Sequence, residues 1–461
     1  MKNSNSYYII VLGLFLGICA PTLWSDGMFM DGLYYAAISR NLADGLGTFW
    51  YLHHTDFSHP IFHEHPPLAI GMQSIFFYLF GDSIYIERIY SLLTFFVTGF
   101  IIHLIWKAVN KKELYSLSWM PLFFWIIIPL NSWACSNNIL ENTMNIFVSS
   151  SVLFSLKSLK NNKLKNIFLA GILLSLAFLS KGFVGLFPLS IFFCYFIVFK
   201  DMRIKEMLIR TSYLLLCTIS PFILLYFLYP TAIDSIQQYI NQQVLKSINH
   251  IQTVDSRFYI IRRLILDLAP GLSTCLIILY FSFKAKFKSS VLEKRWILFF
   301  IFLGLSGVLP IMISMKQSSF YILSALPFFS IALSILAAPF IASLVLKKKI
   351  KIYMLPLFIL IASIALSAKQ IGVIGRDHDL LEDIQVILKV IPDNSVISVD
   401  NNMYNNYQLI GYFARYGNIS LKKKEDELYH HISYKKGNTA LVNYREAKLD
   451  TKTIILYLKN K

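Results

Sequence analysis

The sequence lacks the glycine-rich motifs that bind nucleotides. It has no Walker-type loop and no dinucleotide-binding loop, so nothing in it indicates ATP-driven transport or redox chemistry. Its five cysteines show no paired spacing and therefore indicate neither a disulfide framework nor a zinc site. We interpret them as small core residues: Cys19, Cys135, Cys194, Cys217 and Cys275.

Charged residues are scarce, at 15% of the 461 residues, whereas 56% are hydrophobic. The hydrophobic residues form long runs that approach or exceed the ~20 residues a helix needs to cross a bilayer. Isolated strands could not satisfy their backbone groups in lipid, so the runs predict helices. The sequence predicts an α-helical polytopic membrane protein with about 11 crossings. The clearest runs are 8–24, 84–106, 117–133, 167–180, 183–199, 212–229, 264–283, 296–314, 320–346 and 352–368.

The net charge of +17 predicts an orientation rather than a nucleic-acid partner. Basic residues gather in short connections that fall on one side if the helices alternate, as cytoplasmic loops do. These connections are 107–112, 157–165, 200–210, 284–295 and 347–351. We therefore predict a bacterial inner-membrane protein with a cytoplasmic N-terminus. Pro21 discourages signal cleavage, so the first run is expected to remain as a helix.

The acidic loop that begins at Ser25 is then on the outer face, together with the C-terminal part. A crossing at 66–80 would invert every later loop, so we predict an interfacial helix there. From Lys369 onward, charges of both signs mix with short apolar runs, which predicts a separate domain. The expected division is a membrane domain at 1–368, with its first outer loop at 25–83, and a small extracytoplasmic α/β domain at 369–461. Its predicted elements are helices at 379–391 and 404–416 and strands at 395–399, 439–442 and 453–458.

Asp31 opens the first outer loop shortly after a hydrophobic run. The apolar residues Leu33, Ala37, Ile38 and Leu42 share one face of a short helix that could lie in the membrane interface. A carboxylate at that depth could accept a proton from an attacking hydroxyl. The alternative is that Asp31 only caps the helix N-terminus.

His65 closes the same loop ahead of Pro66 and Pro67. The prolines stiffen the backbone and force the residue before them out of the α region. A stiff corner that carries His65 beside Glu64 would suit a phosphate leaving group. A plain turn that starts the next helix is the alternative.

Together these motifs resemble the first outer loop of C-type membrane glycosyltransferases, in particular the lipid A aminoarabinose transferases and the protein O-mannosyltransferases. The likeness is strongest over residues 26 to 95 and covers most of the membrane part. The residues that carry it are Asp31 to Ala36, Ser39 to Leu42, Glu64 to Leu68, Leu79 to Gly81, Glu87 and Arg88, Leu179 to Gly182, and Lys316 to Leu323.

The resemblance implies transfer of one sugar from a polyprenyl-phosphate donor, usually with inversion. Asp31 matches the family's first acid and is the expected base, and Glu141 stands where a second acid, commonly Asp, is found. His65 occupies the position of a phosphate-binding Lys or His. Gly32 and Tyr34 replace the Glu and Arg often found in the aminoarabinose enzymes, which argues against that sugar.

Cations must meet the charge of the leaving phosphate, because preorganised charge is often the largest catalytic term. Lys181, Lys316 and Arg88 are the expected partners, and Tyr321 belongs to the stretch that resembles the family. A lysine at a helix end could instead merely snorkel to the interface.

No cofactor is expected to be required, although a divalent metal is conceivable. The first loop is rich in histidine, but the spacing fits no recognised ligand set. Asp377, His378 and Asp379 have the form that holds a metal diphosphate, yet they also suit the acidic first turn of a helix.

The sequence therefore predicts a membrane glycosyltransferase with a lipid-linked donor and a glycolipid, polysaccharide or protein acceptor. The alternative is a lipid or polysaccharide transporter, flippase or assembly partner that only binds. Transport would call for ionisable residues along a crossing path, whereas those of this chain gather at the outer ends of helices.

Overall fold

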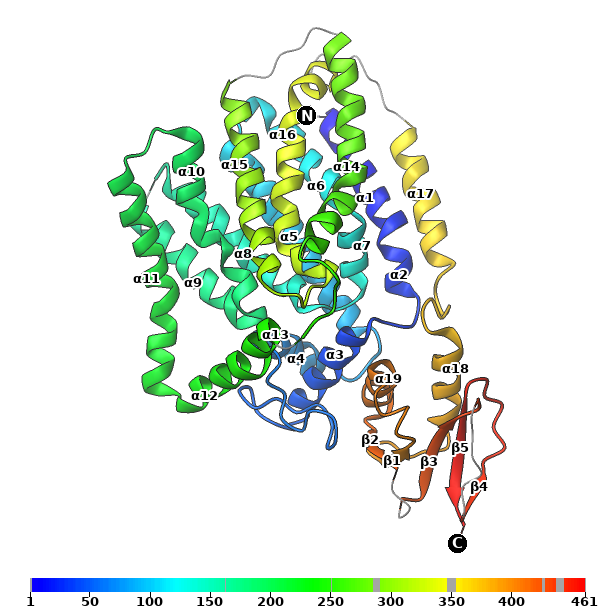
Figure 1. Cartoon of the computed structure of the whole chain (residues 1–461). Coiled ribbons are helices and arrows are strands. Elements are labelled where there is room, and N and C mark those ends of the chain that lie inside the picture. The colour runs from blue at the N-terminus through cyan, green and yellow to red at the C-terminus, as the bar shows by residue number, and fades with distance from the viewer. Residues whose placement is uncertain are drawn as a thin grey trace.

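The computed structural model describes residues 2–161, 163–249, 251–284, 291–345, 354–424, 428–436 and 443–460. Most of the chain forms a bundle of long helices, and a small α/β domain lies at one end (Figure 1). The N-terminus is at the opposite end of the bundle from this domain. The bundle helices are α1 (Lys2–Ile18), α2 (Ala20–Trp24), α5 (Ile86–Val109), α6 (Trp119–Ile126), α7 (Pro129–Ser136), α8 (Leu140–Ser158), α9 (Lys163–Lys181), α10 (Ile191–Phe199), α11 (Ile204–Leu228), α14 (Tyr259–Lys284), α15 (Val291–Val308), α16 (Leu326–Val345) and α17 (Leu355–Ala368).

Within the described residues, six helical stretches are long and apolar enough to cross a membrane. A seventh crossing results if Lys112–Ile126 and Pro129–Ser136, which are bent by 79°, form one broken span. The polytopic helical fold is thus confirmed, while the number of about 11 crossings stays a prediction. The six stretches are Ile86–Val109, Lys163–Lys181, Ile204–Leu228, Tyr259–Lys284, Leu292–Ile313 and Ser319–Leu344.

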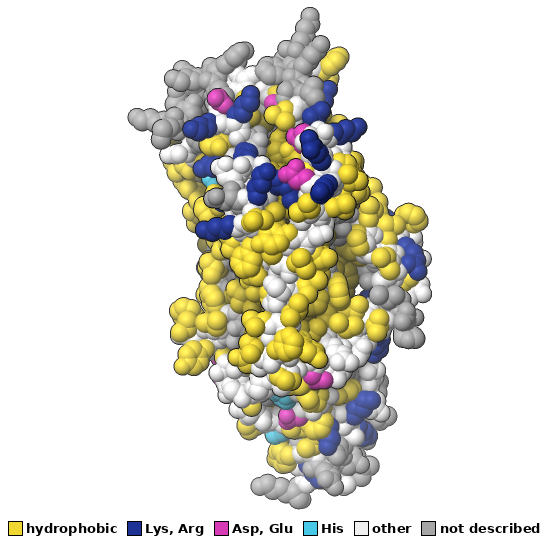
Figure 2. Space-filling view, turned by 90° about the vertical axis from the view of Figure 1, so that its left-hand side faces the viewer, with side chains coloured by type: hydrophobic (Ala, Val, Ile, Leu, Met, Phe, Trp, Pro, Cys, Tyr) yellow, Lys and Arg dark blue, Asp and Glu magenta, His cyan; other side chains and the backbone are white. Residues whose placement is uncertain are grey.

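Figure 2 shows the outer surface of this bundle from one side. Hydrophobic side chains cover its middle, whereas Lys and Arg side chains gather at the upper end and lie again on the lower part. A hydrophobic middle between two charged ends suits a protein that spans a bilayer. Parts of the basic connections at 284–295 and 347–351 lie outside the described residues.

Helix α8 is the polar member of the bundle and occupies the stretch where the alternation of charged loops requires a crossing. Most of its side chains are buried. Asn142 donates hydrogen bonds to Ser91 Oγ at 2.8 Å and to the Ala134 carbonyl at 2.7 Å. Polar and small side chains of this kind join helices in a membrane, where apolar burial offers little driving force.

The first loop contains two helices, α3 (Met30–Ala43) and α4 (Leu68–Phe80). At 13 residues α4 is about 20 Å long, too short to cross a bilayer, as predicted for the segment 66–80. Helix α3 differs from the expectation of an exposed apolar face, because its residues from Gly32 to Asn41 are all buried. Protein rather than lipid covers Leu33 and Ile38.

The remaining short helices join the bundle elements. They are η1 (Lys112–Leu117), η2 (Phe183–Ser190), α12 (Pro230–Tyr239), η3 (Ile240–Leu245), α13 (Lys246–Asn249), η4 (Leu309–Ile313) and η5 (Ser319–Ala325). Helix α12 lies at the same end of the bundle as α3, α4 and the α/β domain (Figure 1).

The C-terminal domain combines two helices with a five-stranded sheet of order β2-β1-β3-β5-β4. β1 is parallel to both of its neighbours, and β5 is antiparallel to β3 and β4. The two predicted helices and the strands predicted at 395–399 and 453–458 are confirmed. Strands β2, β3 and β4 were not predicted. The strand predicted at 439–442 lies outside the described residues. The elements are α18 (His378–Ile387), β1 (Val396–Val399), α19 (Tyr407–Gly417), β2 (Ser420–Lys423), β3 (His430–Tyr434), β4 (Tyr444–Glu446) and β5 (Ile454–Lys459).

This domain shares a hydrophobic core with the first loop. Met28, Leu33 and Tyr34 pack in one cluster with residues of α18, α19 and the sheet. Arg415 of α19 is buried and binds the Glu87 carboxylate through two hydrogen bonds of 3.1 and 2.9 Å. The C-terminal domain is thus docked on the helix that carries Asp31.

Candidate active site

A cavity of about 500 Å³ lies between the first loop and the ends of several bundle helices. Its wall is mainly apolar. Besides three serines, the residues that bring polar groups to it are His65, Lys181, Tyr239, Gln243, Lys316 and Tyr321. They come from the first loop, α9, α12, η3, the η4–η5 connection and η5, so segments far apart in sequence build one pocket.

Asp31 lies in the first turn of α3. It does not line the cavity itself, but its carboxylate interacts with two lysines that do, Lys181 and Lys316. Phe29 is the N-cap residue and makes no side-chain capping bond, so Asp31 does not cap the helix. Burial raises the pKa of Asp31 from 3.8 to about 6; Lys181 opposes this shift and Glu141 adds to it. A carboxylate with such a pKa is mostly ionised at neutral pH and is still basic enough to accept a proton.

Gly32 explains how α3 comes so close to the start of α8. A Cβ atom at Gly32 would lie 2.2 Å from the Asn137 carbonyl oxygen, so no other residue fits there without movement. The Phe29 amide donates to Asn137 Oδ1 at 2.8 Å. This close packing brings the helix start that carries Asp31 next to the one that carries Glu141.

Glu141 and Lys181 form a buried ion pair, with 2.9 Å between Oε1 and Nζ. Glu141 is fully buried and Lys181 is 5% exposed, so Lys181 does not snorkel toward the interface. Its ammonium group lies 5.4 Å from the ring centre of Phe320 and 5.9 Å from those of Tyr35 and Tyr321. Aromatic faces and one carboxylate therefore hold this cation at the cavity wall.

His65 and Lys316 supply the other nitrogen groups of the cavity. Burial holds the pKa of His65 well below its usual value, and the two nearby lysines lower it further. The neutral ring keeps a buried Nδ1 without a hydrogen-bond partner in the described part of the chain. Lys316 Nζ donates to Gln243 Oε1 at 3.3 Å, and burial lowers its pKa as well.

Glu64, unlike its neighbour His65, is not among the residues that line the cavity. Its carboxylate is 3.5 Å from His59 Nε2 and half exposed. The hydrogen bond from His59 lowers the pKa of Glu64. Glu64 still contributes negative charge near Asp31 and Lys316.

Comparisons with solved structures identify the fold. The solved structure of ArnT from Cupriavidus metallidurans bound to undecaprenyl phosphate matches with a TM-score of 0.67 at 13% identity, covering 97% of each chain. Its apo state matches with a TM-score of 0.65 at 13% identity, over 98% of this chain and 97% of that one. The chain has the fold of the C-type membrane glycosyltransferases. This confirms the resemblance that the first-loop motifs predict.

Sequence comparisons support the same superfamily over part of the chain. Residues 64–226 match the family described as dolichyl-phosphate-mannose-protein mannosyltransferase. The undecaprenyl phosphate-alpha-4-amino-4-deoxy-L-arabinose arabinosyl transferase of Wigglesworthia glossinidia brevipalpis is 25% identical over 184 residues, which are 38% of this chain and 31% of that protein. The match therefore spans about a third of this relative. The oligosaccharyltransferase of Archaeoglobus fulgidus in its apo form has a TM-score of 0.52 at 13% identity, over 90% of this chain and 64% of that one.

Within the C-type glycosyltransferase fold, Arg88 is not among the residues that line the cavity. Its guanidinium group donates to the Gly27 carbonyl at 3.1 Å and lies 3.7 Å from the Asp26 carboxylate. Arg88 stands at the start of α5 and contacts the connection that leads into α3. The structure therefore assigns it contacts that hold this connection.

Sequence reasoning missed the side of the cavity formed by α12, η3 and α13. Tyr239 and Gln243 line it, and the positive φ of 100° makes Gly182 necessary where α9 meets this segment. A Cβ atom at Gly182 would lie 1.9 Å from the Tyr239 hydroxyl. The Lys181-Gly182 pair was the available signal, because it marked a sharp turn beside a cation.

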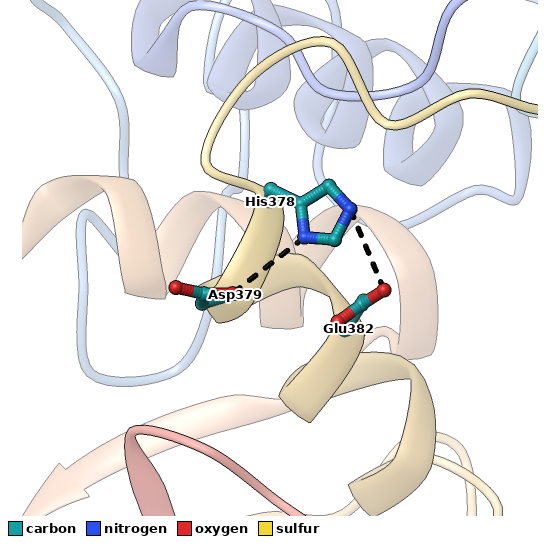
Figure 3. Close-up of side chains that lie close together, drawn as sticks. All are labelled: His378, Asp379 and Glu382. Atoms are coloured by element: carbon teal, nitrogen blue, oxygen red, sulfur yellow. Dashed lines mark ion pairs between the residues drawn. The ribbon is translucent and has the colours of Figure 1, made fainter.

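The histidines of the first loop do not gather three ligands at one point within the described residues. His59 pairs with Glu64, and His63 Nδ1 lies 3.3 Å from Ser235 Oγ. The group of three possible ligands that the described residues contain is His378, Asp379 and Glu382 on α18 (Figure 3).

A lysine already neutralises the acids of this α18 group. Lys452 Nζ lies 2.9 Å from the Asp379 carboxylate and 2.7 Å from that of Glu382. Asp379 stands in the acidic first turn of the helix, as the alternative reading predicted. The arrangement is that of exposed ion pairs on a helix surface.

Proposed function

We propose that this protein is a membrane glycosyltransferase that moves one sugar from a polyprenyl-phosphate donor to an acceptor oxygen. The observation that carries the proposal is a largely apolar cavity whose wall holds two lysines and a neutral histidine, with the buried Asp31 carboxylate close enough to interact with both lysines. Asp31, His65, Lys181 and Lys316 come from three separate regions of the chain. An apolar wall suits a lipid chain, and the nitrogen groups suit its phosphate.

The reaction needs little covalent work from the protein. The acceptor oxygen attacks the anomeric carbon, its proton passes to Asp31, and the bond between that carbon and the phosphate oxygen breaks. The bonding electrons leave with the phosphate oxygen, so the phosphate gains one negative charge. In the proposal, Lys316 and Lys181 meet this charge, and His65 forms a hydrogen bond with a phosphate oxygen. Attack opposite the leaving phosphate would invert the anomeric centre.

Glu141 has a different role in the proposal because Lys181 already occupies one of its oxygens. The second oxygen, Oε2, has no hydrogen-bond partner among the described residues. Glu141 would hold Lys181 in place and direct its ammonium group toward the cavity. Tyr321 would shield the same group through its ring face.

The proposed site lies at the end of the bundle opposite the N-terminus. We assign this end to the outer face of the bacterial inner membrane, because the basic connections between helices belong to the other side. The acceptor would be a glycolipid, a polysaccharide or a protein reached from that face. The lysines meet the leaving charge, so the proposed chemistry requires no cofactor.

Turnover of defined donors by the purified full chain tests the proposal. Suitable probes are the undecaprenyl-phosphate-linked 4-amino-4-deoxy-L-arabinose and the dolichyl-phosphate-linked mannose named for its relatives. We expect release of sugar from at least one donor, and a loss of about 10²- to 10⁴-fold in Asp31→Asn. Asp44→Asn is the matched control, because Asp44 is exposed at the other end of the same helix.

Two results would count against the proposal. Equal turnover by wild type and Asp31→Asn would remove Asp31 as the base. Binding of undecaprenyl phosphate without turnover of either donor would favour a protein that only binds or moves such lipids.

A further inference from the structure

Helix α19 of the C-terminal domain contacts α3 at both ends. At the N-terminal end, Gln408 Nε2 donates to the Met28 carbonyl at 2.8 Å, and the Met28 amide donates to the Tyr412 hydroxyl at 3.2 Å. Met28 precedes the first turn of α3 by two residues. These bonds fix the point at which the chain enters the helix that carries Asp31.

At the other end of α3, the buried guanidinium group of Arg40 caps the C-terminus of α19. It donates to the Ala414 and Arg415 carbonyls at 2.9 Å each, and to Asn418 Oδ1 at 2.7 Å. The last carbonyls of a helix have no partner within the helix, so a buried cation is favourable there. Arg40 thus ties the two helices together in one relative position.

Between these ends, a glycine lets the helices approach closely. A Cβ atom at Gly411 would lie 3.2 Å from Leu33 Cβ and 3.3 Å from two ring carbons of Tyr34. Leu33 and Tyr34 follow Asp31 within one helical turn. Any larger side chain at position 411 therefore pushes on the turn that holds the proposed base.

We infer that α19 is a positioning element of the active site, acting through Gly411 and Arg40 to set where α3 presents Asp31. The inference rests on the proposed function. The groups proposed to bind the donor phosphate do not lie on α3: His65 precedes α4, Lys181 is on α9, and Lys316 lies between η4 and η5. A displaced α3 should therefore impair proton transfer while the cavity still binds the lipid donor.

The test compares Gly411→Leu with Ile397→Ala in the full chain. Ile397 is buried in β1, an interior strand between β2 and β3, so its truncation weakens the domain without adding bulk next to α3. We expect Gly411→Leu to lower kcat at least tenfold with a donor KM within twofold of wild type. Ile397→Ala should keep kcat within twofold at a temperature below its unfolding transition.

Two further measurements separate positioning from folding. Arg40→Lys keeps the charge but loses the planar group that reaches three acceptors, so it should also lower kcat without raising KM. The pKa of Asp31 depends on its distances from the charged groups of Lys181, Lys316, Glu141 and Glu64. Because the position of α3 sets these distances, the midpoint of the acid limb of the pH–rate profile should shift in Gly411→Leu.

The outcomes distinguish the inference from the proposed function. If Asp31→Asn loses turnover while Gly411→Leu behaves like Ile397→Ala, the positioning role is refuted and the proposed base stands. A KM that rises as kcat falls in Gly411→Leu would likewise refute it. If Asp31→Asn has the same turnover as wild type, both the positioning role of α19 and the role of Asp31 as the base are refuted.

Discussion

Replacing Asp31 by Asn should change activity and stability in opposite directions. Burial raises the pKa of Asp31 from 3.8 to about 6, which is about 2 units and therefore about 3 kcal/mol against the ionised form. Because Asp31 stands in the first helical turn, the helix dipole stabilises the ionised carboxylate by up to about 1 kcal/mol. Asn carries no charge, so we expect the variant to be more stable than wild type by about 2 kcal/mol at neutral pH, with turnover lower by about 10²- to 10⁴-fold.

The pH dependence of this difference follows from the direction of the shift. Because folding raises the pKa of Asp31, the folded state binds more protons than the unfolded state between about pH 4 and pH 6. The free energy of unfolding therefore falls as the pH rises from about 4 to about 6. Above about pH 6, the burial of the ionised Asp31 carboxylate destabilises the fold to its full extent. The advantage of Asp31→Asn should shrink toward zero near pH 4, and wild-type turnover should fall about tenfold per unit below pH 6.

Thermal unfolding of both proteins at pH 4.5 and pH 7.5, with turnover measured on the same preparations, provides the assay. Asp44→Asn controls for the loss of one acid from α3. A lower unfolding temperature for Asp31→Asn at pH 7.5 would refute the claim that the fold holds this carboxylate at a cost. An advantage that is equal at both pH values would refute it as well.

Three further predictions concern the charged groups around the site. Lys316→Met should raise the donor KM about tenfold or more, because a hydrogen bond from a charged group contributes about 1.5–3 kcal/mol; a KM within twofold of wild type would contradict a phosphate contact. Lys181→Met leaves Glu141 buried without its partner, so it should lower the free energy of unfolding by about 3–5 kcal/mol. Adding Glu141→Gln removes the unpaired charge, so the double variant should regain most of the stability but none of the turnover. Arg415→Met removes both hydrogen bonds to the buried Glu87 carboxylate and should cost a similar amount, seen as faster proteolysis of the C-terminal domain; unchanged proteolysis would contradict its role in docking.

The sequence predicted the bundle well where the membrane alone dictates structure. The run 84–106 became α5 (Ile86–Val109), because a long apolar segment in lipid must satisfy its backbone as a helix. The clearest runs did not include α8, since Asn142, Asn145 and the serines from Ser149 to Ser151 lower its hydropathy. Asn142 and Thr143 of α8 find polar partners on α5 and α7. The hydropathy of a single segment cannot reveal partners on other helices.

The candidate site was predictable to the extent that its residues carry local signals. His65 precedes two prolines, and Lys181 precedes a glycine that the close approach of Tyr239 requires. Tyr239 and Gln243 have no such signal, because they reach the cavity only through the path of α12 and η3. Arg88 is the opposite case: its position in the sequence suggested a phosphate contact, and in the structure it contacts Asp26 and Gly27.

The largest difference between sequence and structure concerns α3 itself. Its apolar residues suggested one face toward lipid, but the structure divides them among separate cores. Leu33 packs with the C-terminal domain, Ile38 packs with Leu52 and Phe62 of the first loop, and Ala36 packs with residues of α4 and α5. A helix buried on every side shows little periodicity, so its pattern could not reveal its surroundings. The same burial that hides this pattern desolvates Asp31, and it is why a partner more than 370 residues away in sequence can affect the proposed base.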